Sequence, residues 1–277
     1  MISLAPPRLN VFKNIMVLRK MSNAIDGVKK AYGAYKKLQE ANRISQHFSN
    51  FFEPVVASTQ EELSGVQKIR HDVFCQELKL FEATGDNVEV DFFDAYSSQC
   101  LIKHTRTGTF GGSVRIINPR NDDDILPIEK VASEYITKTE YLPSNFDRHE
   151  VCEISRIAIP KEFRRRRADQ FKGAAQAAIN TDTYSEEELR CFPLIAVGLY
   201  ISAAALAVKQ GKKHAYFMVE PRLAKSMRYI GIKLIKIGGE FNYVGRRAPY
   251  YVNYELFCRD LSPSFKYMMD QFLKKMG

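Results

Sequence analysis

The chain has 277 residues, of which 45% are apolar and 26% are charged, and its formal net charge is +9. This composition is typical of a globular protein with a sizeable core. Residues 1–50 hold nine Lys and Arg residues against two acids, so most of the positive charge lies in this segment. The net charge of the whole chain is therefore no argument that the remaining residues bind nucleic acid. No zinc pattern, RNP aromatic motif or clear recognition helix is present, and we expect no nucleic-acid partner.

The cysteines and the apolar stretches bear on location. Five cysteines at irregular spacing include no C-x-x-C pair, so we expect reduced thiols, a cytoplasmic protein and no metal site. Pro6, Pro7 and Lys13 interrupt any apolar signal-peptide core. Residues 191–208 carry no charge and resemble a membrane span, but Pro193 and their barely sufficient length favour a buried helix.

Residues 9–48 predict one long or two short amphipathic helices, because apolar residues recur at helical spacing between lysines. Such a helix either is solvated and packs on the following domain, or offers a basic face to an acidic partner or an anionic membrane surface. In the second case residues 1–50 would form a peripheral contact with the inner membrane surface. We expect a basic helical extension, residues 1–50, before one domain of residues 51–277.

Strand and helix patterns alternate after residue 50. Thr59 and Glu62 form a capping-box pattern at the start of a helix, and Pro221 and Pro263 suit the first turn of two others. The expected strands are residues 52–58, 99–105, 109–117, 148–160, 214–219, 232–237 and 250–257. The expected helices are residues 59–80, 164–180, 194–210, a short one from residue 221, and 262–275. This order predicts a mixed α/β domain.

The stretch from Arg148 to Pro160 predicts the central strand, in which Glu153 and Arg156 stand among apolar residues. Strict alternation puts residues 151, 153, 155 and 157 on one face and residues 152, 154, 156 and 158 on the other. A buried carboxylate and a buried guanidinium are costly to desolvate unless they are paired or used. The two are therefore either a structural ion pair at a strand end or part of a site.

Upstream, Glu89, Asp91 and Asp94 place three carboxylates in six residues, which repel one another unless cations lie nearby. The candidate cations are three arginines on other elements, namely Arg70, Arg115 and Arg156. Arg115 stands in a strand among apolar residues, where a purely structural role is the alternative.

Four motifs follow one another in this order: Arg70-x-x-x-Phe74, Glu89-x-Asp91-x-x-Asp94, Arg115 in a strand, and Glu153-x-Ser155-Arg156. As an ordered set they resemble acyl-homoserine-lactone synthases, which are acyltransferases of the GNAT fold. Later motifs, Val219-Glu-Pro221-x-Leu223 and Gly245-Arg-Arg247-Ala-Pro249-Tyr250, resemble more closely the N-acyl amino acid synthases and exosortase-associated acyltransferases. The likeness covers roughly residues 50–258 and implies a GNAT-like mixed, mostly antiparallel sheet flanked by helices.

The chain also departs from these families. Gln99 and Val244 stand where the sister group often has His. Four arginines, Arg164, Arg165, Arg166 and Arg167, stand where GNAT enzymes commonly have a glycine-containing pyrophosphate loop. This departure fits a donor presented on acyl carrier protein, of which only one phosphate enters the site, better than coenzyme A. The four arginines would meet that phosphate or the acidic carrier surface, unless they are only a solvated charge run.

The resemblance implies an N-acyltransferase that moves a fatty acyl group from acyl carrier protein to the amine of an amino acid. The acyl-phosphopantetheine would be the donor substrate, with no bound cofactor. Glu153 is the first candidate for the general base and Asp94 the second. Ile157 and Ala158 would offer backbone N–H groups to the pantetheine and the oxyanion. The substrate pocket, with one arginine left for the acceptor carboxylate, would consist of Arg70, Phe74, Glu89, Asp91, Arg115 and Arg156.

Three alternatives stay open. Phe74, Phe81 and Phe92 either line an acyl tunnel or pack in the core. A second alternative is that the acceptor is S-adenosylmethionine, which would give a homoserine lactone; the C-terminal motifs argue against it. A third alternative is that the chain is not an enzyme but a basic module that binds a membrane or nucleic acid through residues 1–50.

Overall fold

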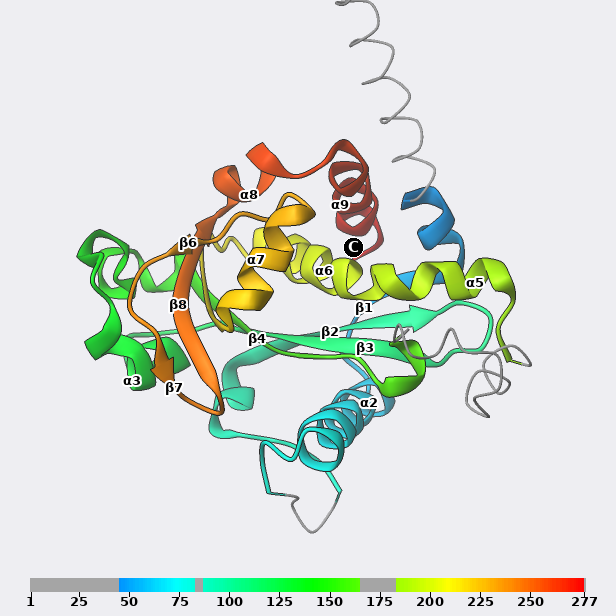
Figure 1. The fold of residues 1–277 in the computed structure, drawn as a ribbon, viewed down its shortest axis with the longest axis horizontal. Helices are drawn as coiled ribbons and strands as arrows, with labels where there is room; N and C mark the ends of the chain where they lie inside the picture. The colour runs from blue at the N-terminus through cyan, green and yellow to red at the C-terminus, as the bar shows by residue number, and fades with distance from the viewer. Residues whose placement is uncertain (1–44, 83–86, 165–182, 277) are drawn as a thin grey trace, which may run out of the picture.

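The structure is a computed structural model that describes residues 45–82, 87–164 and 183–276. In these residues an eight-stranded sheet runs through the molecule, with helices on both of its faces (Figure 1). The strands are β1 (Phe52–Val56), β2 (Ser97–His104), β3 (Phe110–Ile117), β4 (Val151–Ala158), β5 (His214–Val219), β6 (Ile235–Lys236), β7 (Phe241–Asn242) and β8 (Arg246–Asn253).

The strand order is β1-β2-β3-β4-β5-β8-β6, and β7 also pairs with β8. Strands β4 and β5 run parallel, whereas the other described pairs are antiparallel. The predicted mixed, mostly antiparallel sheet is therefore confirmed. It places the two strands that carry the site, β4 and β5, in the middle.

Helices cover both faces of this sheet. Helix α6 (Ile195–Lys209) lies on one face with α9 (Pro263–Lys275) against it, and α2 (Gln60–Arg70) lies on the other (Figure 1). A π-helical segment, His71–Glu77, continues α2. The shorter helices are α3 (Pro127–Ala132), α5 (Glu186–Cys191), α7 (Pro221–Tyr229) and α8 (Tyr254–Asp260).

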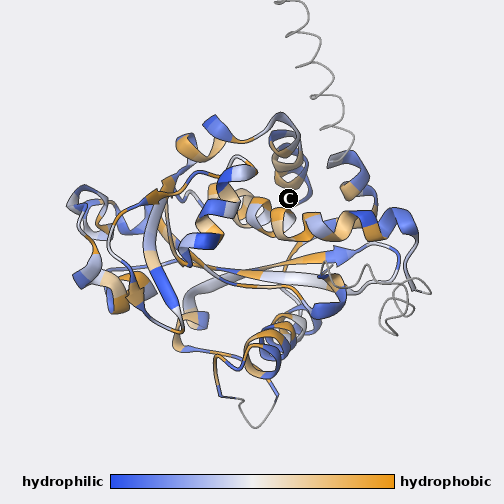
Figure 2. Ribbon diagram, viewed as in Figure 1, coloured by the Kyte–Doolittle hydropathy of each residue, from blue (hydrophilic) through white to orange (hydrophobic). Residues whose placement is uncertain are grey.

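The uncharged stretch at residues 191–208 forms a core helix, as the sequence predicts. The segment Glu186–Lys209 is long and apolar enough to span a membrane, but 67% of its most apolar window is buried within the domain. Figure 2 shows that α6 is apolar along most of its length. The largest hydrophobic core lies between this helix and the sheet.

Side-chain caps explain two element boundaries. The Thr59 hydroxyl accepts the Glu62 N–H and the Glu62 carboxylate accepts the Thr59 N–H, so the predicted capping box forms. The prediction of a strand through residue 257 is wrong, because the Asn253 side chain accepts the Leu256 N–H and starts α8. The strand predicted at residues 232–237 is reduced to the two residues of β6.

Helix α3 is an element that the sequence does not lead us to expect. Pro127 occupies its first turn, and the Glu129 carboxylate accepts the Leu126 N–H at 2.6 Å. Both are ordinary signals of a helix start and could have shown it. The omission matters because the first turn of α3 faces Glu153.

Strand β4 contains a bulge that breaks the predicted alternation. Arg156 has a φ of +51°, and the β3–β4 pairing shifts register between Ser113 and Arg115. Arg156 therefore lies on the Glu153 side of the sheet, where it binds carboxylates. Ala158 lies in the core under α2. The predicted faces of residues 156–158 are wrong because an extra residue reverses the alternation.

Strands β4 and β5 pair only from Val151 and His214 to Glu153 and Tyr216. Beyond Glu153 the two strands diverge, while β5 continues to pair with β8 up to Val219. Residues 154–158 consequently have no strand partner on the β5 side among the described residues. Backbone groups and side chains at this divergence are available for a site.

Three predictions fall wholly or mainly outside the described residues: the helices at residues 9–48 and 164–180, and Arg165 to Arg167. Of the proposed extension, residues 45–50 are described and are helical. Phe48 is fully buried and stacks on Phe52 of β1. These last residues of the extension therefore already pack on the domain.

Candidate active site

A cavity of about 180 Å³ opens where β4 and β5 diverge. Strand β4 contributes residues 153–157 to its wall and β5 contributes residues 217–219. Further wall residues are Tyr243 and Val244 from the turn before β8 and Arg247 from β8 itself. The cavity therefore brings together the central strand and a C-terminal turn that lies almost 90 residues further along the chain.

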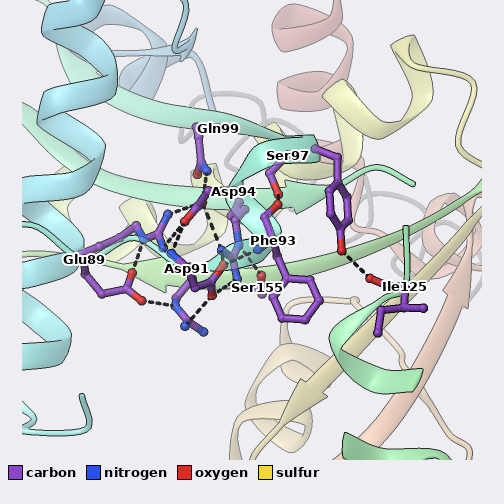
Figure 3. A network of polar contacts seen from close by, with 12 residues as sticks. Glu89, Asp91, Phe93, Asp94, Ser97, Gln99, Ile125 and Ser155 are labelled. Atoms are coloured by element: carbon purple, nitrogen blue, oxygen red, sulfur yellow. Dashed lines mark hydrogen bonds and ion pairs between the residues drawn. The ribbon is translucent and has the colours of Figure 1, made fainter. Parts of the chain in front are cut away.

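The upstream carboxylates meet the arginines beside this cavity, and Figure 3 shows Glu89, Asp91 and Asp94 in one network. Arg70 donates to Glu89 at 2.5 Å and to both oxygens of Asp94 at 2.6 and 2.9 Å. Gln99 Nε2 also donates to Asp94, at 2.9 Å. Arg70 is 1% exposed, so this ion pairing is what allows its charge to be buried.

The same network continues to the central strand. Arg115 donates to both oxygens of Asp91, at 2.5 and 3.0 Å, and to the Ser155 hydroxyl at 3.1 Å. Arg156 donates to Glu89 at 3.0 Å and to Asp91 at 2.9 Å, and its guanidinium lies 4.4 Å from the centroid of the Phe81 ring. The bulge in β4 is what brings Arg156 to these acids.

The predicted pairing of three arginines with three carboxylates is thus confirmed. The expectation that one arginine stays free for the acceptor carboxylate is wrong, because each of the three guanidinium groups is bound by carboxylates. The network holds the loop of residues 87–94 against the sheet and shapes one wall of the cavity. Arg115 and Arg156 also line the cavity, but they share their charges with these acids.

Asp94 is unsuited to the role of base. Burial by itself would raise its pKa, but hydrogen bonding to Arg70 and the charges of Arg115 and Arg70 lower the pKa to about 2. Such a carboxylate stays ionised and takes up a proton only in strong acid. It also does not line the cavity. Asp94 therefore serves the network and not proton transfer, which corrects the second candidate.

Glu153 has the opposite environment. Its side chain lines the cavity, the residue is 1% exposed, and burial raises its pKa to about 8. Among the described residues its one hydrogen bond comes from the Ile128 N–H of α3, which donates to Oε2 at 2.7 Å. The helix start fixes one carboxylate oxygen, and within the described part of the chain the other oxygen has no donor. A buried carboxyl of this kind can exchange a proton near neutral pH.

The residues predicted to bind the acyl donor lie in different places. Ile157 lines the cavity, whereas the side chain of Ala158 packs under α2. Arg164 forms an ion pair with Glu77 of the π-helical segment. The roles of Ile157, Ala158 and the four arginines toward a donor stay predictions.

The aromatic residues differ in position. Phe74 and Phe81 line the cavity, as an acyl-binding wall requires. Phe92 does not line it and is 69% exposed, so the predicted tunnel role of Phe92 is wrong. Tyr200 of α6, which the sequence does not single out, lines this cavity and also a second apolar cavity of about 40 Å³ behind it.

Arg247 of β8 is another wall residue to which the sequence analysis assigns no role. Its Nη1 donates to Glu220 and its Nη2 to the Val244 carbonyl, both at 3.0 Å. The motif around it, Gly245-Arg-Arg-Ala-Pro, carries a family resemblance but does not by itself assign a role to Arg247. Neither burial nor cavity position can be inferred from such a motif.

The described residues contain no group of three His, Cys, Asp or Glu side chains arranged to hold a metal ion. The five cysteines are free thiols. For Cys152 on β4, burial raises the pKa of the thiol to about 12, so it is not a thiolate nucleophile at neutral pH. The side chains with polar groups that line the cavity are carboxyl, guanidinium and hydroxyl groups.

Residues 69–172 match the family model described as the acetyltransferase (GNAT) domain. No curated protein matches the chain significantly. Among solved structures, TofI in a ternary complex with an inhibitor and MTA is 14% identical, with a TM-score of 0.53 over 77% of this chain and 99% of its own.

Two other solved structures are similar in shape. MesI, a CoA-dependent acyl-homoserine lactone synthase, is 15% identical, with a TM-score of 0.51 over 82% of this chain and 96% of its own. FeeM, an N-acyl amino acid synthase from uncultured soil microbes, is 10% identical, with a TM-score of 0.49 over 77% and 96%. The domain match, with the fold of TofI and MesI, shows a GNAT-like fold that carries the site between β4 and β5.

Proposed function

We propose that this GNAT-type acyltransferase moves a fatty acyl group from an acyl carrier protein thioester to the amine of an amino acid. The observation that carries the proposal is Glu153, a buried carboxyl with a pKa of about 8 on the wall of the cavity. It lies where the two central strands diverge and where backbone donors and apolar walls meet.

In the proposed reaction the amine nitrogen attacks the carbonyl carbon of the thioester. A C–N bond forms, the proton lost by the nitrogen goes to Glu153, and the C–S bond breaks as the tetrahedral intermediate collapses. The thiolate takes this proton from Glu153 and leaves as the pantetheine thiol, so the products are an amide and a thiol and Glu153 is again ionised. A base whose pKa lies near working pH suits this proton transfer.

The oxyanion of the intermediate would be stabilised by backbone N–H groups of β4 near Ile157, which have no β5 partner. The acyl chain would lie on the apolar wall. Ile154, Tyr200, Phe217 and Met227 line both the main cavity and the smaller apolar one behind it, and so offer a path for methylene groups.

Mass spectrometry tests the proposal directly. The purified protein is mixed with a long-chain acyl carrier protein and all twenty amino acids, and new small molecules are identified. A new N-acyl amino acid supports the proposal and names the acceptor. An intact thioester with no product would contradict it.

Two further arms separate the alternatives. Replacing the amino acids by S-adenosylmethionine tests the homoserine-lactone reaction, because a lactone product would move the proposal to that acceptor. Replacing the carrier protein by acyl-coenzyme A tests the donor. Product from coenzyme A alone would contradict the carrier-protein donor while leaving acyl transfer in place.

A further inference from the structure

The cavity wall carries five charged side chains among the described residues: Asp91, Arg115, Glu153, Arg156 and Arg247. Asp91 is bound by both Arg115 and Arg156, so these three partly neutralise one another within the wall. Neither Glu153 nor Arg247 forms a hydrogen bond or ion pair with them. Within the described wall, the Glu153 carboxyl and the Arg247 guanidinium are therefore the two charged groups that pair with no other wall residue.

The partner of Arg247 lies outside the cavity. Glu220 does not line the wall, and its side chain is 54% exposed against 21% for Arg247. Glu220 is also the N-cap residue of α7 but makes no capping bond with its side chain. Ion pairs with so exposed a partner are weak. A substrate carboxylate can therefore replace Glu220 on this guanidinium at little cost.

The turn before β8 orients Arg247. Val244 has a φ of +52°, a region that β-branched residues rarely adopt, and its carbonyl accepts from Arg247 Nη2. Such backbone strain persists where the surrounding structure holds it and is frequent at ligand sites. One edge of the guanidinium is thus fixed by the backbone, while Nη1 is held only by the exposed Glu220 among the described residues.

We infer that Arg247 binds the carboxylate of the amine acceptor and that Glu220 occupies this place on Arg247 when the acceptor is absent. The inference rests on the proposed function, in which Glu153 receives the proton of the acceptor amine. A zwitterionic acceptor would meet Glu153 with its nitrogen and would meet Arg247, in place of Glu220, with its carboxylate. The site thereby selects amines that carry a carboxylate over plain amines.

A competition between acceptors tests this inference. Amino acids and the matching amino-acid amides, which keep the amine but lose the negative charge, are offered together with the acyl carrier protein donor. The ratio of acylated acid to acylated amide, measured by mass spectrometry, compares kcat/KM for each pair. Because variants are compared with wild type, the intrinsic reactivity of the two amines cancels.

Arg247→Gln should lower the preference for the acid roughly 10- to 100-fold, the scale of a charge-assisted hydrogen bond to a carboxylate. Arg246→Gln is the matched control and should leave the preference unchanged. Its exposed side chain pairs with Glu240 and does not line the cavity. Glu220→Gln should raise the preference, because it removes the competing carboxylate from Arg247.

An unchanged acid-to-amide ratio in Arg247→Gln would overturn the inference, and a lower ratio in Glu220→Gln would overturn the role of Glu220. If wild type acylates no amine, the proposed function fails, and thermal unfolding with each mixture tests Arg247 alone. A rise in Tm with amino acids, absent with amides and lost in Arg247→Gln, supports the carboxylate site. No such rise in wild type overturns it.

Discussion

Two carboxyl groups in one small region have opposite proton affinities, and each follows from its neighbours. Asp94 accepts hydrogen bonds from Arg70 and Gln99, and its pKa is about 2. Glu153 is buried with one backbone donor, and its pKa is about 8. From the sequence alone, both residues were candidates for the general base. The partners that separate them come from distant segments, so only the folded chain distinguishes the base from the ion-pair member.

Glu153 should also reduce stability as the pH rises. A Glu side chain in the unfolded chain ionises near its ordinary pKa of 4.5, while burial keeps the folded one protonated up to a pKa of about 8. The contribution of Glu153 to the free energy of unfolding is therefore fully present below pH 4.5. It falls by roughly 5 kcal/mol as the pH rises from 4.5 to about 8.

Glu153→Gln should remove that fall, so its free energy of unfolding relative to wild type should increase from pH 5 to pH 8. Urea denaturation at a series of pH values measures the difference. The same substitution at Glu61, on the exposed side of α2, is the control. Parallel pH profiles for wild type and Glu153→Gln would show that the carboxyl is not held protonated.

At the scale of elements, the site depends on one irregularity in one strand. Periodicity predicted β4 and its burial correctly, since a strand repeats every two residues. It could not predict the bulge at Arg156, because the bulge is set by the register with β3 and by the acids at Glu89 and Asp91. The pairing of arginines with acids was predictable from charge. That all three arginines would pair with these acids was not.

Breaking this network should be costly. Arg115→Met removes both bonds to Asp91 and the bond to Ser155, and should lower the free energy of unfolding by about 3–5 kcal/mol, as expected when one member of a buried ion pair is lost. Asp91→Asn in the same background measures the coupling between the two residues. A loss below about 1 kcal/mol in Arg115→Met would mean that the network is not structural.

At the scale of the whole molecule, the fold class and the cavity rim differed in how far the sequence predicted them. The fold class was predictable because the order of strands and helices and the motif series are spread along the chain. The cavity rim at Val244 and Arg247 was not, because it joins the C-terminal turn to the central strand only in three dimensions. Phe48 belongs to the core, so a clean truncation has to leave it in place.

We propose that this segment binds an anionic membrane surface, since each basic residue near such a surface contributes about 1 kcal/mol. Deleting residues 1–44 should then leave acyl transfer within about twofold of wild type and abolish binding to anionic vesicles. Vesicle sedimentation and the acyl-transfer assay measure the two effects on the same preparation. Loss of both activities together would show that the segment belongs to the catalytic domain.

The central claim is that Glu153 is the base for acyl transfer, and the pH dependence of kcat/KM in wild type and Glu153→Gln tests it most directly. With the same acceptor in both proteins, titration of the amine is shared and cancels in the ratio of the two rates. We predict that wild type exceeds the variant by at least about 100-fold at its plateau. We also predict that the ratio grows with pH and levels off above about 8. A ratio that stays near one, or that does not change with pH, would contradict the account.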